Sequence, residues 1–170
     1  GRLQEASSED PLVSAVLGSA EVEGLQGGRG RGPTDGYLGG AGSRAVAALA
    51  KHFVAYGAAA GGLNAAGAEL SERTLRDVFL FPWRALVRAG ARGVMPAHQP
   101  VFDAPCHGSA YVGQTLLRDE LGFEGLSVSD CSDVGALVQW RVARDNAEAA
   151  ALGVAATVDQ DNQCGDNATW

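Results

Sequence analysis

The chain has 170 residues, of which 46% are hydrophobic and 19% are charged, and this composition indicates one ordinary globular core rather than a disordered chain. Its 13 lysines and arginines are outnumbered by 20 aspartates and glutamates, and the net charge of -7 gives no general attraction to nucleic acid or anionic lipid. No apolar run approaches the roughly 20 residues of a membrane helix. We therefore expect neither nucleic acid nor a membrane as a partner.

The chain begins at Gly1 without an initiator Met, and its first residues lack the basic and apolar regions of a signal peptide. We expect it to be part of a longer protein, and the sequence leaves its compartment open.

The first predicted helix starts at Asp10-Pro11, an N-cap followed by proline at the first helical position. Its apolar residues recur at helical spacing to about Gly24; they are Leu12, Val13, Val16, Leu17 and Ala20. Residues 27–42 are rich in glycine and predict a surface loop. Two arginines in this loop are spaced as in some RNA-binding tracts, but in an acidic chain we favour a solvated linker.

Residues 46–53 are apolar and then abruptly polar, and we interpret them as a strand. Ser71 is expected to cap a helix that Pro82 kinks and Gly90 ends. The apolar positions expected to share one face of this helix are Leu75, Val78, Phe79, Leu86 and Val87.

Strands are predicted over residues 93–97, 126–129 and 154–158, and helices over residues 111–121 and 146–152. Alternating strands and helices are typical of parallel βαβ units and an α/β fold. About four such units correspond to the later half of a (β/α)8 barrel, which typically takes about 250 residues. Because an open half-barrel leaves edges and an apolar face uncovered, the isolated chain should be marginally stable, oligomeric or aggregation-prone.

The strongest candidate for chemistry is Asp130, which directly follows the strand predicted over residues 126–129. A carboxylate at the carboxyl end of a parallel strand lies where α/β proteins collect their functional groups. An aspartate there also serves as a helix cap or turn former, and Asp133 is interpreted as the N-cap of the following helix.

The cysteines do not form a disulfide framework by number or spacing, and we interpret Cys106, Cys131 and Cys164 as buried thiols. A zinc set of these cysteines with His98 and His107 is the weaker alternative, because the CxxC and HxxxH spacings are absent.

The chain resembles the family 3 glycoside hydrolases, the β-glucosidase and β-xylosidase family, in motifs that follow the family's order over nearly its whole length. Besides residues 116–130, these are Gly1-Arg2-x-x-Glu5, Ser8-Glu9-Asp10-Pro11, Gly24-Leu25-Gln26-Gly27, Lys51-His52-Phe53, Val94-Met95-Pro96-Ala97 and Pro105-Cys106-His107.

The resemblance implies that residues 1–170 are a fragment of a catalytic (β/α)8 barrel of a retaining glycosidase. Asp130 is then the nucleophile, Arg2, Lys51 and His52 contact sugar hydroxyls, and Met95 lines the same subsite. The substrate is a β-linked oligosaccharide or an aryl or alkyl glycoside with terminal glucose or xylose. The two carboxyl groups need no metal or organic cofactor. Judged alone, Lys51 reads as a surface lysine and His52 as a core histidine.

The sequence also departs from the family pattern. Ser127 replaces an aliphatic strand residue, His98 a common Tyr, Ser109 a frequent Asn, and Cys131 an aromatic or small residue, while Asp159 to Asp161 match the Asp-x-Asp ending only loosely. The acid/base residue, which commonly comes from a following domain, has no identifiable counterpart. A missing barrel half and C-terminal domain are therefore expected partners. The alternatives are an inactive carbohydrate-binding remnant and, more weakly, an unrelated α/β protein that binds a small molecule.

Overall fold

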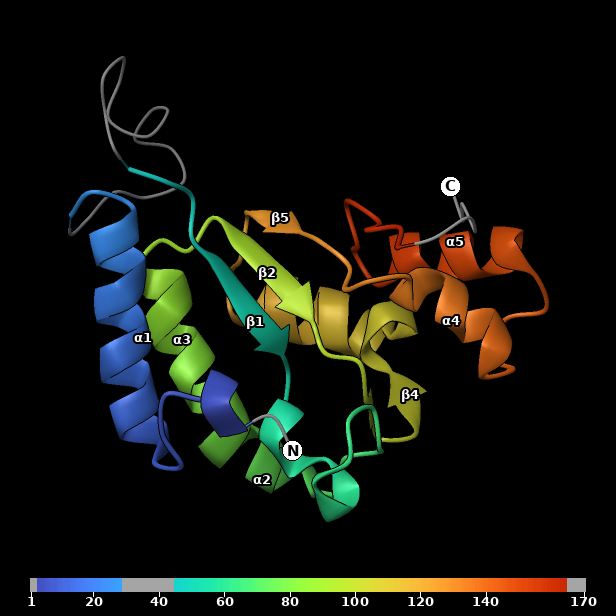
Figure 1. The fold of residues 1–170 in the computed structure, drawn as a ribbon, viewed down its shortest axis with the longest axis horizontal. Helices are drawn as coiled ribbons and strands as arrows, with labels where there is room; N and C mark the ends of the chain where they lie inside the picture. Colours follow the sequence, from blue (N-terminus) through green and yellow to red (C-terminus); the bar gives the residue numbers. More distant parts are fainter. Residues whose placement is uncertain (1–2, 29–44, 165–170) are drawn as a thin grey trace.

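A parallel three-stranded sheet with the order β1-β2-β5 lies at the centre of the molecule (Figure 1). The computed structural model describes residues 3–28 and 45–164. The strands are β1 (Leu49–Phe53), β2 (Gly93–Pro96) and β5 (Leu126–Ser127). Val128 then pairs in parallel with Gln160, which brings a fourth segment to the sheet beside β5. The strands predicted over residues 46–53, 93–97 and 126–129 are confirmed, as is the α/β class.

The first helix, α1 (Pro11–Leu25), begins as predicted. The Asp10 carboxylate accepts hydrogen bonds from the backbone N–H groups of Leu12 and Val13, which would otherwise lack partners in the first turn. At its other end, the buried Gln26 side chain donates to the Gly90 carbonyl and accepts from the Ala48 N–H. Gln26 thus ties the end of α1 to the start of β1. Most of the loop predicted over residues 27–42 lies outside the described residues.

The helix predicted after Ser71 is divided into three parts. Ser71 caps α2 (Glu72–Thr74), a π-helical turn η4 (Leu75–Phe79) follows, and α3 (Leu80–Arg88) ends before Gly90, whose φ is 90°. The wider π-helical turn changes the register ahead of Pro82. Leu75 is consequently buried while Val78 is exposed, so the prediction of one shared apolar face is wrong for Val78.

The second half of the chain adds the π-helical η6 (Tyr111–Glu120) and the helices α4 (Asp133–Gln139) and α5 (Asn146–Ala155). The short elements are η1 (Leu3–Glu5), η2 (Tyr56–Ala58), η3 (Ala60–Gly62), β3 (Pro100–Val101), β4 (Ala104–Pro105) and η5 (Cys106–Gly108). The strand predicted over residues 154–158 is wrong. The alanine-rich helix capped by Asp145 continues through Val154, and strand-like pairing begins only near Gln160.

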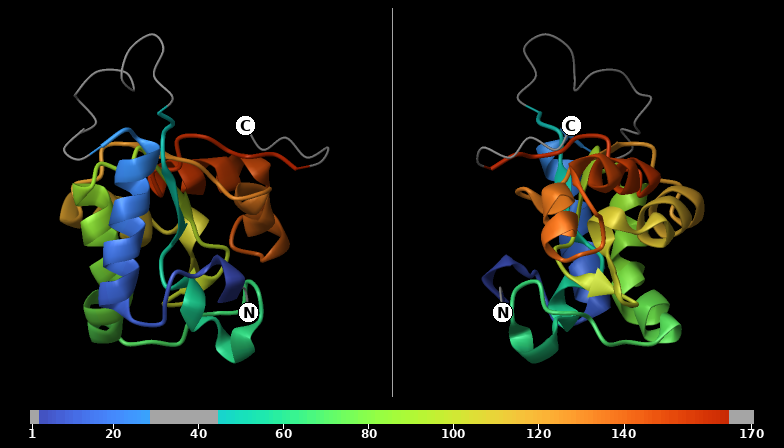
Figure 2. Two further views of the ribbon diagram at one scale, coloured as in Figure 1. Left: turned by 60° about the vertical axis from the view of Figure 1, so that its left-hand side comes forward. Right: turned by 90° about the vertical axis from the view of Figure 1, so that its right-hand side faces the viewer.

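Three clusters of buried side chains hold these layers together, one of them formed by Val22, Ala48 and Ala91 beside α1. The largest cluster lies around the sheet, with Phe53 packed edge-on against Trp83 at a ring distance of 5.0 Å. The third cluster joins α4, α5 and Val158 and includes Val134 and Leu137. In two further views α1 and α3 run side by side, whereas α4 and α5 form a separate layer (Figure 2). None of the helices in the described part of the chain has the length and apolar character needed to span a bilayer.

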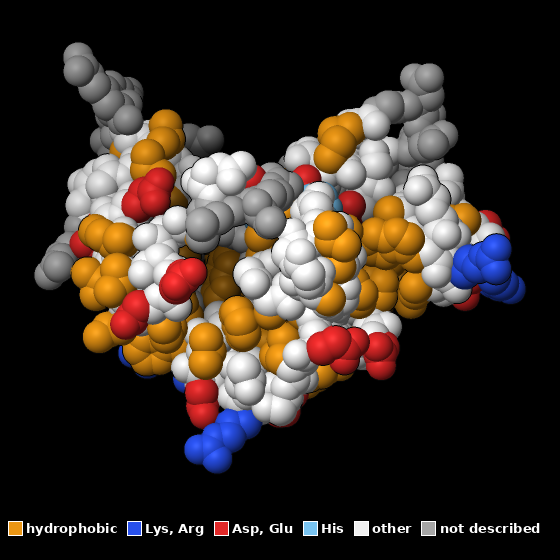
Figure 3. All heavy atoms as spheres, turned by 60° about the horizontal axis from the view of Figure 1, so that its bottom comes forward, with side chains coloured by type: hydrophobic (Ala, Val, Ile, Leu, Met, Phe, Trp, Pro, Cys, Tyr) orange, Lys and Arg blue, Asp and Glu red, His pale blue; other side chains and the backbone are white. Residues whose placement is uncertain are grey.

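The outer side of α1 and α3 exposes apolar residues. On α1 these include Leu12 and Val16, which are 59% and 60% exposed, and Phe81 on α3 is also exposed. Hydrophobic side chains gather on the side of the molecule where α1 lies (Figure 3). Among the described residues β1 is an edge strand, and together with this exposed apolar flank it fits a partial barrel.

The cysteines differ from the prediction. Cys131 and Cys164 form a disulfide, and only Cys106 is a buried free thiol. The two half-cystines are 33 residues apart in sequence, and it is the pairing of Val128 with Gln160 that brings their segments together. Because both thiols are used in this bond, they are not ligands of the zinc set considered above.

Candidate active site

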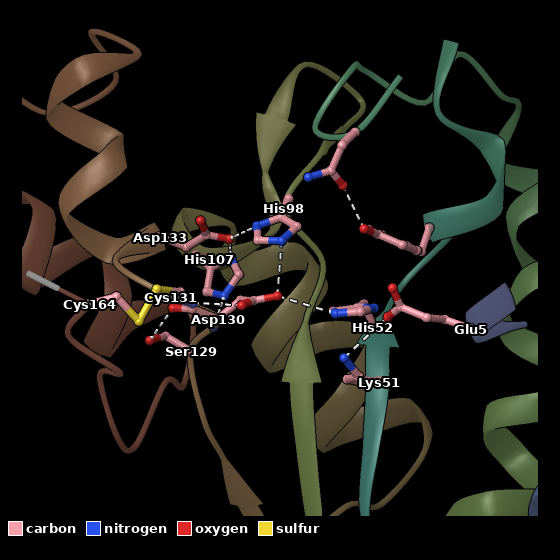
Figure 4. Close-up of polar contacts among 12 residues, drawn as sticks. Glu5, Lys51, His52, His98, His107, Ser129, Asp130, Cys131, Asp133 and Cys164 are labelled. Atoms are coloured by element: carbon pink, nitrogen blue, oxygen red, sulfur yellow. Dashed lines mark hydrogen bonds and ion pairs between the residues drawn. A yellow bond between two sulfur atoms is a disulfide. The ribbon is translucent and has the colours of Figure 1, made fainter. Parts of the chain in front are cut away.

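Three neighbouring strand ends bring His52, His98 and Asp130 together (Figure 4). His52 lies in β1, His98 follows β2, and Asp130 follows β5. Asp130 Oδ2 lies 3.2 Å from His52 Nε2 and 3.0 Å from His98 Nε2. Parallel strands place their carboxyl ends at one edge of a sheet, and for this reason residues far apart in the sequence converge here.

The Asp130 carboxylate is held on both oxygens. The Cys131 N–H donates to Oδ1 at 2.6 Å, while the two histidine rings face Oδ2. Partial burial raises the pKa of Asp130, but the Cys131 hydrogen bond and the nearby histidines outweigh this, and the pKa is lowered overall. The carboxylate is therefore ionised at neutral pH, and about one of its four lone-pair sites has no partner among these contacts.

The backbone around Asp130 is also fixed. The Asp130 N–H donates to His107 Nε2 at 3.0 Å, and the Ser129 hydroxyl donates to Asp161 at 2.8 Å and accepts from the Asn162 N–H. The disulfide joins the next residue, Cys131, to the same C-terminal segment. The turn that carries Asp130 is thus held in place by hydrogen bonds and a disulfide.

Behind Asp130 lies a second, buried carboxylate, that of Asp133. Its Oδ2 is 2.7 Å from His98 Nδ1 and 3.2 Å from His107 Nδ1. The N-cap interpretation of Asp133 is wrong: α4 begins at Asp133 itself, and Ser132 occupies the cap position with a φ of 60°. The side chain turns to the two imidazoles; His98 makes a hydrogen bond to it, and His107 lies at ion-pair distance without a hydrogen bond.

The other predicted site residues lie around this centre or outside the described chain. Lys51 Nζ pairs with Glu5 Oε2 at 3.2 Å and does not contact Asp130 in the structure. Met95 is half-buried in β2 and lies opposite Lys51 in the strand register. The His52 side chain is buried and stacks on Tyr56 with a ring distance of 4.3 Å. Arg2 lies outside the described residues.

Sequence reasoning missed the roles of His98, His107 and Asp133. His98 was noted only as a replacement for Tyr and a zinc candidate, and His107 only as part of a motif. The signal was the spacing of Asp130 and Asp133, which places the second carboxylate in the first turn of α4, facing back toward the sheet end. Among the described residues, no group of three or more His, Cys, Asp or Glu is arranged to hold a metal ion.

A parallel α/β sheet with an ionised carboxylate at its strand ends is the arrangement of a barrel-type hydrolase domain. The comparisons with known proteins give the particular family: residues 1–161 match the N-terminal domain of glycosyl hydrolase family 3, and the chain belongs to this family. The resemblance seen in the motifs and the partial barrel fold are thereby confirmed.

Curated relatives include a β-xylosidase of Formosa agariphila, 43% identical over 98% of this chain and 22% of the relative, and a periplasmic β-glucosidase of Salmonella typhimurium, 31% identical over 94% and 20%. Among solved structures, a β-glucosidase of Listeria innocua in complex with isofagomine aligns with a TM-score of 0.87 and 34% identity, over 95% of this chain and 22% of that chain. The chain thus spans about a fifth of the length of these relatives.

Proposed function

We propose that this chain carries the nucleophile of a retaining β-glycosidase that acts on terminal β-linked glucose or xylose, with Asp130 as that nucleophile. The observation that carries the proposal is the state of the Asp130 carboxylate. It is held on both oxygens, it has a lowered pKa, and it lies at the carboxyl ends of the strands. The names of the β-xylosidase and β-glucosidase relatives support the reaction class.

In the proposed reaction, an oxygen of Asp130 attacks the anomeric carbon and forms a glycosyl-enzyme while the leaving oxygen takes a proton from an acid. Water then hydrolyses the ester and restores the free carboxylate. Lys51, His52, Met95 and Arg2 are proposed to surround the sugar, where the polar side chains bind its hydroxyls and orient its anomeric carbon toward Asp130. The substrates in view are β-linked oligosaccharides and aryl or alkyl glycosides.

The contacts around Asp130 in the described part of the chain do not identify the acid. Of the carboxylates drawn beside Asp130, that of Glu5 pairs with Lys51 and that of Asp133 with two histidines. We propose that a further part of a longer protein, including the rest of the barrel and a following domain, supplies it. The apolar flank of α1 supports this, because preceding barrel units would cover it.

The test uses a 2-deoxy-2-fluoro β-glucoside and β-xyloside that carry 2,4-dinitrophenolate, a leaving group that needs no acid catalyst. The 170-residue chain is incubated with each compound, its intact mass is recorded, and the adduct is mapped by peptide digestion. We expect one glycosyl adduct on Asp130. Asp130→Asn should give none, whereas Asp77→Asn, which removes an exposed carboxylate of η4, should label like the unaltered chain.

The carboxylates of Glu5 and Asp133 are already paired, with Lys51 and His107, so neither is a ready acid for hydrolysis. This favours a second candidate function, a carbohydrate-binding remnant that no longer hydrolyses. Such a chain binds glucose or xylose in a calorimetric titration and forms no adduct. Absence of an adduct on a sample that unfolds cooperatively therefore overturns the nucleophile assignment and supports this candidate.

A further inference from the structure

His98 lies between two carboxylates. Its Nδ1 is 2.7 Å from Asp133 Oδ2 and its Nε2 is 3.0 Å from Asp130 Oδ2. Ionised carboxylates only accept hydrogen bonds, so each ring nitrogen must donate, and this requires the doubly protonated imidazolium. With the side chain only 15% exposed, both bonds are shielded from water and charge-assisted.

His107, unlike His98, is a neutral imidazole with a single ring proton. Its Nε2 accepts the Asp130 N–H at 3.0 Å and therefore carries no proton, which leaves the ring proton on Nδ1, 3.2 Å from Asp133 Oδ2. This tautomer is assigned from the partners of the two nitrogens. Burial, the largest influence, lowers the pKa of His107 and keeps the ring neutral. Asp133 Oδ2 thus makes a hydrogen bond with His98 Nδ1 and an ion-pair contact, outside hydrogen-bond geometry, with His107 Nδ1.

We propose that His98 is a positioning residue for the Asp130 carboxylate, and that the buried Asp133 holds His98 and His107 in the orientation this requires. Through His98, Asp133 fixes the position of Oδ2; through His107, it fixes the backbone N–H of the same residue. This proposal rests on the proposed function. It adds a positioning role for three residues that are not proposed to contact the sugar, namely His98, His107 and Asp133.

The arrangement predicts a specific pH dependence. When His98 loses the proton on Nε2, its lone pair faces the Asp130 carboxylate, and the two groups repel. Attack by Asp130 should therefore slow as the pH rises through the pKa of His98. The titratable groups that face His98 come from β1, η2, η5, the turn after β5, and α4; they are His52, Tyr56, His107, Asp130 and Asp133.

The kinetic test measures the rate of labelling by the fluoroglycoside against pH. Since the leaving group needs no acid, a fall in rate at alkaline pH reports the groups around the nucleophile. His98→Gln keeps one donor but no charge, and we expect the maximal labelling rate to fall at least tenfold, with the half-saturating inactivator concentration changed less than threefold. Asp133→Asn should shift the alkaline limb to lower pH. The matched control is Asp145→Asn, which alters the cap of α5 and should leave the limb in place.

The second measurement needs no substrate. The chain has only 3 histidines, and all of them lie in this network, so nitrogen NMR can follow each ring. We expect His98 to be doubly protonated at pH 7 and His107 to be the neutral Nδ1–H tautomer. Asp133→Asn should lower the pKa of His98, because it removes the negative charge 2.7 Å from Nδ1.

These two readouts separate the inference from the function on which it rests. If the unaltered chain forms no adduct, the nucleophile assignment fails, but the NMR titration still decides whether Asp133 controls His98. If the chain labels, and His98→Gln labels within twofold of it at every pH, the positioning role is overturned. An unchanged His98 titration in Asp133→Asn overturns the role of Asp133.

Discussion

A single methyl group at Gly113 should disrupt the junction that carries the C-terminal part of the sheet. A Cβ built on Gly113 in η6 would lie 1.8 Å from the Ala156 carbonyl oxygen, 2.5 Å from its carbon and 3.0 Å from Thr157 Oγ1. Ordinary contact requires about 3.5 Å, so the two segments must separate by well over ~1 Å. Backbone atoms cannot rotate away as a side chain can.

The displaced segment has little freedom to move. Ala156 caps α5 through its bond to the Leu152 carbonyl, and just beyond it Asp159 and Gln160 bond to Ser127 of β5. Overpacking ordinarily costs about 1–3 kcal/mol, and this contact with backbone on both sides should lie at the upper end, about 3 kcal/mol. That is a large share of the roughly 5–15 kcal/mol that stabilises a typical domain.

Urea denaturation followed by circular dichroism measures the effect of Gly113→Ala. With a slope of about 2 kcal/mol per M, the midpoint should fall by about 1.5 M. Gly24→Ala is the matched control, because Gly24 lies in α1, is exposed and has nothing within 4 Å of the added methyl. Alanine there should raise stability by up to about 1 kcal/mol through helix propensity. If Gly113→Ala stays within about 1 kcal/mol of the unaltered chain, the close approach of η6 and α5 is refuted.

Three further outcomes are expected. The buried Ser127 hydroxyl has no hydrogen-bond partner among the described residues, so Ser127→Ala should keep or raise the unfolding free energy by about 1 kcal/mol, and a clear loss in urea would contradict this. Burial raises the pKa of Cys106 to about 12, so thiol reagents should modify no cysteine in the folded chain, one after unfolding, and three after reduction of Cys131–Cys164. Folding lowers the pKa of Asp130 below the value of about 3.9 that is usual for an aspartate. The ionised carboxylate therefore stabilises the fold fully at a pH above about 3.9, and this stabilisation is lost as the pH falls through the lower pKa of the folded state. The acid limb of the labelling rate should accordingly lie below pH ~3.9, and a limb between pH 4 and 5 would count against the assignment.

The fold was largely predictable because its signals are local. Asp10 and Ser71 cap helices in the way their sequence context predicts, and the apolar runs that became β1, β2 and β5 sit between clear turn signals. Errors arose where tertiary packing overrides local pattern. The segment around Val154 has the composition of a strand, but it continues a helix whose start Asp145 fixes.

The same distinction between local sequence signals and tertiary packing explains which site residues could be predicted. Asp130 could be found because a strand-end aspartate within an ordered set of family motifs is a feature of one short segment. Its partners could not, because His98, His107 and Asp133 meet only when β2, η5 and α4 are packed together. The disulfide was missed for the same reason, since 33 residues separate two cysteines that lie side by side only after Val128 pairs with Gln160.

The two carboxylates next to α4 illustrate how burial divides labour between identical groups. Asp133 is buried, and both imidazoles turn an Nδ1 toward the same oxygen, so burial keeps this carboxylate away from a sugar at the strand ends. Asp130 lies at the rim, where its charge is maintained by donors on three sides and where it keeps an open lone-pair site. Three residues of separation thus place one carboxylate where it can organise the site and the other where it can react.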